Sequence, residues 1–205
     1  MQNWEDLDTI QFYKTTRLYL EDDTLEDSTY QLHTYVLYPD MNGKYSWKED
    51  DKEFEVVYDN GFVMMNENGK NIALSETNIE KYKLSFLGAQ FVICLPFKLN
   101  DPGVQLSYEG SDIFNGRQVE VLKASYNAEL DNHTKSHDWW HYFDKKTYKY
   151  LGYKVYHSPT YPKVYNIGTA DIQGVTFPEY RRTYRVDADD NELYLRAEFW
   201  YSFED

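Results

Sequence analysis

Four Asn-Gly dipeptides divide this chain of 205 residues into short segments, and they begin at Asn42, Asn60, Asn68 and Asn115. Both residue types tolerate positive φ, which the central residues of a type I′ hairpin turn require. The segment EFEVVYDNGFVMM, around the second dipeptide, therefore predicts a strand, a two-residue turn and a second strand. Further turns are expected at residues 144–147, 171–174 and 187–191.

Between these turns, apolar and polar residues alternate. Every second residue from Leu193 to Tyr201 is apolar, whereas Arg196 and Glu198 lie on the opposite face. A period of two is the pattern of a half-buried strand. The 21 tyrosines and the aromatic content of 18% suit pleated surfaces, where rings pack across strands. Roughly ten or eleven such segments predict an antiparallel meander.

One stretch, from Thr77 to about Cys94, follows helical spacing instead. Thr77 and Glu80 form a capping box at its start, and Phe86 and Phe91 belong to the apolar stripe that follows. The sequence therefore predicts a mainly β fold, with an antiparallel sheet curled into an unclosed half-barrel and one main helix across its concave side. No Pro/Ser-rich linker or repeat divides the chain, so we expect a single domain over residues 1–205, from which an N-terminal leader and helix could have been trimmed.

Charge and cysteine content restrict the partners. The net charge of −14 disfavours nucleic acid and anionic membrane surfaces, because both repel an acidic protein. The single cysteine, Cys94, excludes an internal disulfide, and its apolar surroundings indicate a buried, inert thiol. The longest apolar run, from Phe86 to Phe97, is too short to span a bilayer, so no transmembrane segment is expected.

Three histidines, His133, His137 and His141, are spaced by four residues, which on a helix would bring two zinc ligands together. The aromatic stretch that contains His137 and His141 reads as a strand, in which they would lie about 13 Å apart, too far to share one zinc ion. His133 reads as a surface loop residue. Either strand histidine could still join a metal with ligands from other strands, but we expect no metal and no cofactor.

Motifs for nucleophilic, phosphate-binding or metalloprotease chemistry do not occur in the sequence. One basic cluster stands out, because Arg181, Arg182 and Arg185 lie on a segment with strand-like alternation. Alternation places Arg181 and Arg185 on the same face. Cross-strand pairing with acidic residues is the first interpretation of this cluster, and contact with an anionic head group is the alternative.

Three segments carry a resemblance to a known family: LPFKLNDPGVQLSYEG (residues 95–110), NGRQVEVLKASY (115–126) and WWHYFDKKTYKYLGY (139–153). The chain resembles a family of secreted or lipid-anchored proteins from Bacteroidota, within the wider group built like the LolA and LolB lipoprotein carriers. The resemblance implies an unclosed antiparallel barrel whose helix covers an apolar cavity, and carriers of the group hold acyl chains there. It implies no catalytic residues, and it places the protein in the periplasm or on the cell surface of a Gram-negative bacterium.

The chain departs from the wider group in two respects: a helix usually precedes the first strand, and a lipid-attachment cysteine near the start would be expected of an anchored member. A leader and a first helix that were trimmed away would account for both departures, and so would a member that has no lid helix.

These observations predict a non-catalytic binding module that sequesters a lipid-like or other apolar ligand. Phe86, Leu87 and Phe91 are expected to face inward from the helix, opposite Trp140 and Tyr142, or opposite Trp139 if the strand faces are swapped.

Two alternatives remain open. The first is a structural or assembly protein of the cell envelope, with a filled core and a protein partner. The second is a metal-assisted enzyme that uses His137 or His141.

Overall fold

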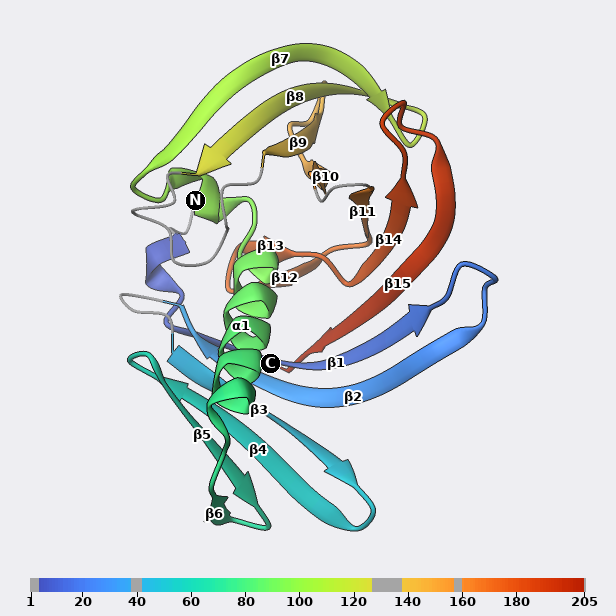
Figure 1. The fold of residues 1–205 in the computed structure, drawn as a ribbon. Helices are drawn as coiled ribbons and strands as arrows, with labels where there is room; N and C mark the ends of the chain where they lie inside the picture. Colours follow the sequence, from blue (N-terminus) through green and yellow to red (C-terminus); the bar gives the residue numbers. More distant parts are fainter. Residues whose placement is uncertain (1–3, 38–41, 127–137, 157–159, 205) are drawn as a thin grey trace.

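The computed structural model describes residues 4–37, 42–126, 138–156 and 160–204, and these residues form a mainly β protein. Thirteen strands pair in one antiparallel sheet, in the order β6-β5-β4-β3-β2-β1-β15-β14-β11-β10-β9-β8-β7. A separate hairpin joins β12 to β13. The sheet curls without closing, and the predicted half-barrel is confirmed (Figure 1).

The fifteen strands of the described residues extend from Thr9 to Phe203. They are β1 (Thr9–Tyr19), β2 (Leu25–Val36), β3 (Asn42–Glu49), β4 (Lys52–Asp59), β5 (Phe62–Glu67), β6 (Lys70–Ile72), β7 (Val104–Phe114), β8 (Arg117–Tyr126), β9 (Trp139–Asp144), β10 (Tyr150–Val155), β11 (Tyr161–Ile167), β12 (Ala170–Ile172), β13 (Val175–Phe177), β14 (Tyr180–Val186) and β15 (Glu192–Phe203). One α-helix, α1 (Glu76–Ile93), and two short 3-10 helices (Trp4–Asp6 and Phe97–Asn100) complete the described residues.

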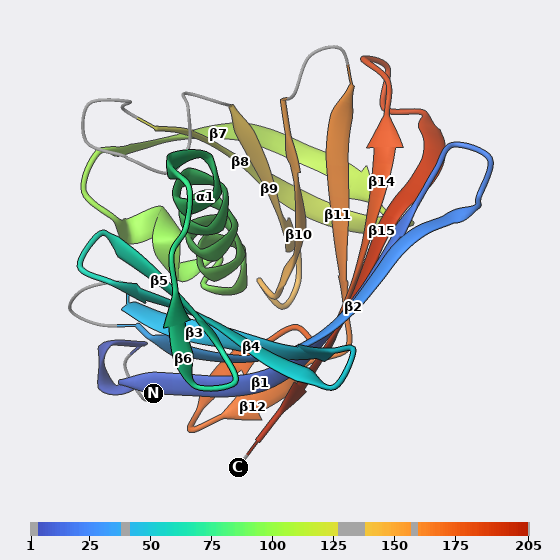
Figure 2. The same cartoon turned by 60° about the horizontal axis from the view of Figure 1, so that its bottom comes forward.

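Helix α1 lies inside the curl of the sheet. It joins the two edge strands β6 and β7 through the chain and runs between two walls, one formed by β1–β6 and the other by β7–β11 (Figure 2). Strands β15 and β14 connect the two walls, because β15 pairs with β1 and β14 pairs with β11. The helix α1 can therefore pack apolar side chains against both walls of the sheet.

The turn chemistry explains most of the hairpins. Asn60-Gly61, Asn68-Gly69 and Asn115-Gly116 each separate two paired strands with both residues at positive φ, as predicted. The turns predicted at 144–147, 171–174 and 187–191 also separate paired strands. The turn predicted at Asn42-Gly43 is wrong, because both residues lie within β3. A Cβ on Gly43 would be 2.2 Å from the carbonyl oxygen of Thr34, so glycine serves a close approach of strands there rather than a turn.

The helix forms where the apolar spacing predicted it, but its start is different. The N-cap is Ser75, whose hydroxyl oxygen accepts a hydrogen bond from the backbone N–H of Asn78 at 3.3 Å. Thr77 therefore lies in the first turn and is not the cap. Serine and threonine are both common N-cap residues, and two candidates two residues apart cannot be ranked from spacing alone.

Aromatic rings hold α1 against both walls. The Phe86 ring is stacked on Tyr58 at a centroid distance of 4.8 Å and lies edge-on to Tyr35 at 5.2 Å, both on the β1–β6 wall. Five residues further along the helix, Phe91 lies edge-on to Trp139 of β9 at 5.4 Å. Two hydrophobic clusters, one on each wall, thus share the helix.

Gly152 shapes the second wall from within β10. Its φ is +148°, and a Cβ at this position would be 2.0 Å from the carbonyl oxygen of Val164 on β11 and 3.0 Å from the Phe114 ring. Phe114, at the end of β7, packs over the glycine and is stacked on Tyr142 at 4.1 Å. Only glycine leaves room for both the neighbouring backbone and this ring.

We expect Gly152→Ala to destabilise the protein by several kcal/mol, because the methyl group would overlap the Val164 carbonyl in a backbone region that alanine disfavours. Gly88→Ala is the matched control: Gly88 is exposed on α1 and a Cβ there has nothing within 4 Å. Since alanine is the better helix former, it should stabilise by about 0.5–1 kcal/mol. Urea unfolding of both variants measures the difference, and similar stabilities would contradict the role assigned to Gly152.

Candidate ligand-binding site

The predicted ligand contacts on α1 all face the interior. Phe86, Leu87 and Phe91 have exposed fractions of 0%, 2% and 4%. They are covered by other side chains of the protein: Phe86 and Leu87 lie in the cluster on the β1–β6 wall, and Phe91 lies in the cluster on the β7–β11 wall. The space beneath the helix is therefore packed around these three residues.

The preferred pair opposite the helix was assigned to the wrong face of β9. Trp139 faces α1, whereas Trp140 and Tyr142 lie on the other side of the sheet. Tyr142 packs there under Phe114, and the Trp140 ring lies 5.1 Å from the Nζ of Lys154. Alternation shows which residues share a face but not which face turns inward, and the Phe114 end of the β7–β8 hairpin gives the outer face a buried aromatic layer of its own.

The histidine stretch is described only in part, because His133 and His137 lie outside the described residues. His141 is in β9, as predicted, and is completely buried. Within the described part of the chain, no three His, Cys, Asp or Glu side chains gather as metal ligands.

A slot opens between β10 and β11, where the two strands separate. They pair from Lys154 to Gly152, and the described pairing ends at Gly152 with Tyr165. Beyond that point β10 continues along β9 with an irregular register between Tyr150 and Gly152, while β11 continues along β14 through Ile167. Strand β10 thus stays paired with β9, and β11 stays paired with β14, while β10 and β11 separate from each other. This separation opens the sheet locally.

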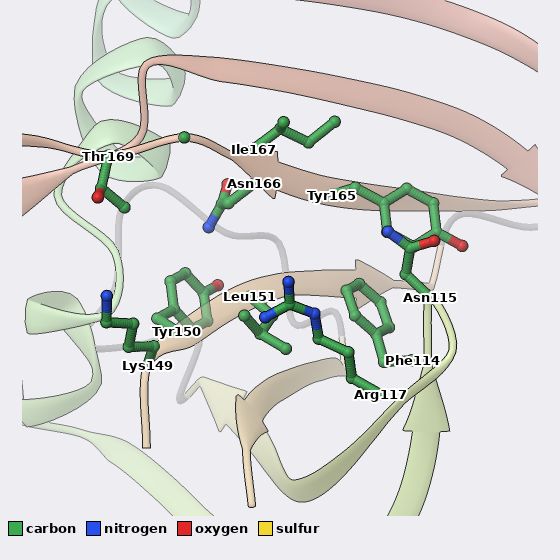
Figure 3. A pocket seen from close by; sticks show the side chains of 11 residues that line it. Phe114, Asn115, Arg117, Lys149, Tyr150, Leu151, Tyr165, Asn166, Ile167 and Thr169 are labelled. Atoms are coloured by element: carbon green, nitrogen blue, oxygen red, sulfur yellow. The ribbon is translucent and has the colours of Figure 1, made fainter. Parts of the chain in front are cut away.

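The slot contains a pocket of about 290 Å³, at the low end of the usual range for small-molecule sites. Apolar walls come from Phe114, Leu151, Tyr165 and Ile167, and Figure 3 shows their side chains around the opening. The remaining lining residues are Asn115, Arg117, Lys149, Tyr150, Asn166, Gly168 and Thr169. The combination of rings, aliphatic groups and a few polar groups suits an amphipathic ligand.

Two lining residues connect the slot to the concave interior. The hydroxyl of Tyr150 is hydrogen-bonded to Nδ1 of His141 at 3.0 Å. The side-chain oxygen of Asn166 accepts a hydrogen bond from Nε of Arg181 at 2.9 Å. From Tyr150, ring contacts continue through His141 and Trp139 to Phe91, with centroid distances of 5.9, 6.1 and 5.4 Å. A continuous series of ring contacts thus runs from the pocket wall to the predicted contacts Trp139 and Phe91.

Arg181 is 1% exposed and corrects the first interpretation of the arginine cluster. Its Nη2 donates to the backbone carbonyl of Val92 at 2.8 Å, and no carboxylate pairs with it among the described residues. Arg182, on the opposite face, has the acidic partner instead, Glu198 at 3.5 Å.

Several buried polar atoms have no hydrogen-bond partner in the described residues. They are Oε1 of Gln90, Nε1 of Trp139, Nε2 of His141 and Nη1 of Arg181. Buried polar groups are satisfied in the great majority of cases, so four such atoms on facing elements mark an interior equipped for a polar group. The spacing of residues within a single strand gives no sign that these atoms are left without partners.

Lys14 adds a second cation on the concave side. Burial, with a smaller contribution from the charge of Arg181, lowers the pKa of Lys14 to about 8. Its Nζ lies 5.1 Å from the Phe199 ring. Burial and the charge of Lys14 also hold the pKa of His33 well below its usual value. The interior of the half-barrel is therefore electropositive, although the whole chain carries a charge of −14.

Solved structures with the same architecture define the class of fold. A LolA superfamily protein from Nitrosomonas europaea superposes with a TM-score of 0.54 at 9% identity, over 97% of this chain and 84% of that one. A domain assigned to outer-membrane lipoprotein sorting, from Vibrio parahaemolyticus, gives 0.53 at 10% identity, over 96% and 83%. A DUF1329 family protein from Desulfovibrio piger gives 0.53 at 9% identity, over 97% and 84%. The fold is LolA-like.

Residues 36–162, more than half of the chain, match the family of unknown function DUF6503, and the protein belongs to that family. No curated protein sequence matches the chain. None of the helices formed by the described residues combines the length and apolar character that a membrane crossing needs.

Burial lowers the pKa of His141 to about 3, so the folded protein keeps this ring neutral while the unfolded chain protonates it near its ordinary value of 6.5. Below pH 6.5 the unfolded state therefore binds more protons than the folded state, so the stability of the fold decreases as the pH is lowered. We expect a loss of about 2 kcal/mol from this residue between pH 6.5 and pH 5.

Urea unfolding over this pH range measures the loss, and His141→Gln should remove it. His33→Gln should remove a separate share of the same pH dependence, because the pKa of His33 is also lowered by burial. An unchanged pH dependence in His141→Gln would contradict the neutral, buried state of this ring.

Proposed function

We propose that residues 1–205 act as one non-catalytic binding domain that sequesters a lipid-like ligand in its half-barrel, with the slot between β10 and β11 as the entrance. The single observation that carries the proposal is the separation of these strands at Gly152, which leads from an apolar pocket toward the concave interior. The LolA-like fold supports it, because the family resemblance of the sequence implies an apolar cavity that holds acyl chains.

Shape and chemistry of the slot fit an acyl chain better than a sugar or nucleotide. Phe114 and Tyr165 present rings, and Leu151 and Ile167 present aliphatic groups, at the outer part. A chain that passes Tyr150 would next meet His141 and then the predicted contacts Trp139 and Phe91. Burial of apolar area would supply most of the binding free energy.

A second candidate function is a structural or assembly role in the cell envelope, without a ligand. The observation that favours it is the packing beneath α1, where Phe86 and Leu87 are already covered by the protein's own side chains. In both cases we place the protein in the periplasm or at the cell surface of a Gram-negative bacterium, on the basis of the fold shared with lipoprotein-sorting and LolA superfamily proteins.

Titration with the methyl ester of a pyrene-labelled fatty acid tests the binding function. The wild-type protein should bind this neutral probe, and Ile167→Asp should weaken binding about ten-fold, because it places a charge in the apolar wall. The matched control is Ile113→Asp on β7, outside the pocket. The two isoleucines are 40% and 59% exposed, so neither change should unfold the protein.

Equal affinities of the two variants would show that the probe does not occupy the slot. Failure of the wild-type protein to bind the probe at all would reject the carrier function and leave the structural role.

A further inference from the structure

The slot is lined by cations and by no carboxylate. Among its lining residues, the charged side chains are Arg117 and Lys149. Figure 3 shows the guanidinium of Arg117 extending toward the middle of the pocket, beside Leu151, while Lys149 lies at the side near Tyr150. The chain has 35 acidic and 21 basic residues, so a pocket whose charged lining residues are all basic differs in sign from the net charge of the protein.

Both cations lack an acidic partner within the part of the chain that the structure describes. Seven lysines and two arginines of the described residues do form ion pairs with carboxylates, so acids are available where pairing is favourable. The acid that feels the Arg117 charge is Asp144, whose pKa is lowered first by hydrogen bonds from Thr147 and more weakly by Arg117. One oxygen of Asp144 already accepts from Lys146 and Thr147.

Arg181 extends the positive field inward. Its Nε is held by Asn166, which lines the pocket, and its Nη1 is buried without a hydrogen-bond partner among the described residues. Lys14 is the next cation on the concave side, close enough to Arg181 for its pKa to be lowered by that charge. One carboxylate approaches the rim, since the Glu179 side chain lies against Gly168, but it is not a lining group.

We propose that the slot selects an amphiphile with an anionic head group, a carboxylate or a phosphate, which Arg117 and Lys149 bind while the apolar part follows the rings inward. This inference rests on the proposed function and specifies its ligand class. Charge-assisted hydrogen bonds from an arginine to a carboxylate or phosphate are the strong class of polar contact. Arg181, which has no carboxylate partner among the described residues, lies behind Asn166 and strengthens the positive electrostatic field at the head group. Few mobile ions screen a buried charge.

The test compares two forms of one probe: a pyrene-labelled fatty acid and its methyl ester, at pH 7. The wild-type protein should bind the acid about ten-fold more tightly than the ester, the effect of one charge-assisted hydrogen bond. In the double variant Arg117→Gln/Lys149→Gln this ratio should fall to about one. Lys48→Gln/Lys70→Gln, a matched control on exposed residues of β3 and β6, changes the net charge equally and should keep the preference.

The outcomes separate the two proposals. Equal binding of acid and ester by the wild-type protein, or an unchanged preference in the double variant, overturns the anionic head group while the carrier function stands. Binding of neither probe rejects both. Inorganic phosphate should not displace the acid at millimolar concentration, and complete displacement by phosphate would assign the cations to a small free anion instead of an amphiphile.

Discussion

The attachment of α1 to both walls is the interaction on which the rest of the structure depends. An open sheet of thirteen strands has a large apolar concave face, and the helix is the only α-helix among the described residues that can cover it. On one wall, Phe86 packs on aromatic rings and the Gln90 side chain donates to the carbonyl of Val36 at 2.9 Å. On the other, Phe91 contacts Trp139 and Arg181 donates to the carbonyl of Val92. These contacts fix the curvature of the sheet.

Local signals in the sequence were sufficient for the elements but not for their faces. Three Asn-Gly dipeptides and the period-two alternation predicted hairpins because turn conformation and side-chain direction are local properties. Gly43 misled the same reasoning, since this glycine serves a close approach to the backbone of Thr34 on β2, which a turn motif does not reveal. Phe114, twenty-five residues before Trp139 in the chain, covers Tyr142 on the outer face of β9. The alternation within β9 does not show this contact, and the choice of Trp140 and Tyr142 as the inward pair was therefore wrong.

The slot was missed because it is a property of a strand pair. Gly152 inside an aromatic strand was the one available signal, since an isolated glycine in a strand often marks a bulge or a close approach. Nothing in β10 alone shows that β11 leaves it there. Arg181 was singled out from the sequence, but whether it meets an acid is decided by Asn166 and by the C-terminal turn of α1, and the alternation of β14 contains neither.

The seam between β1 and β15 has a consequence for how the chain folds. Phe12 pairs with Phe203, so the two ends of the chain meet in the middle of the sheet, whereas β1–β6 and β7–β11 are meanders of neighbouring hairpins. Contacts between distant residues carry the larger loop-closure entropy and form slowly. Each meander can therefore assemble from local contacts first, and we expect the seam to close around the helix in a later and slower step. During synthesis, β1 must wait for β15 before it gains its second neighbour.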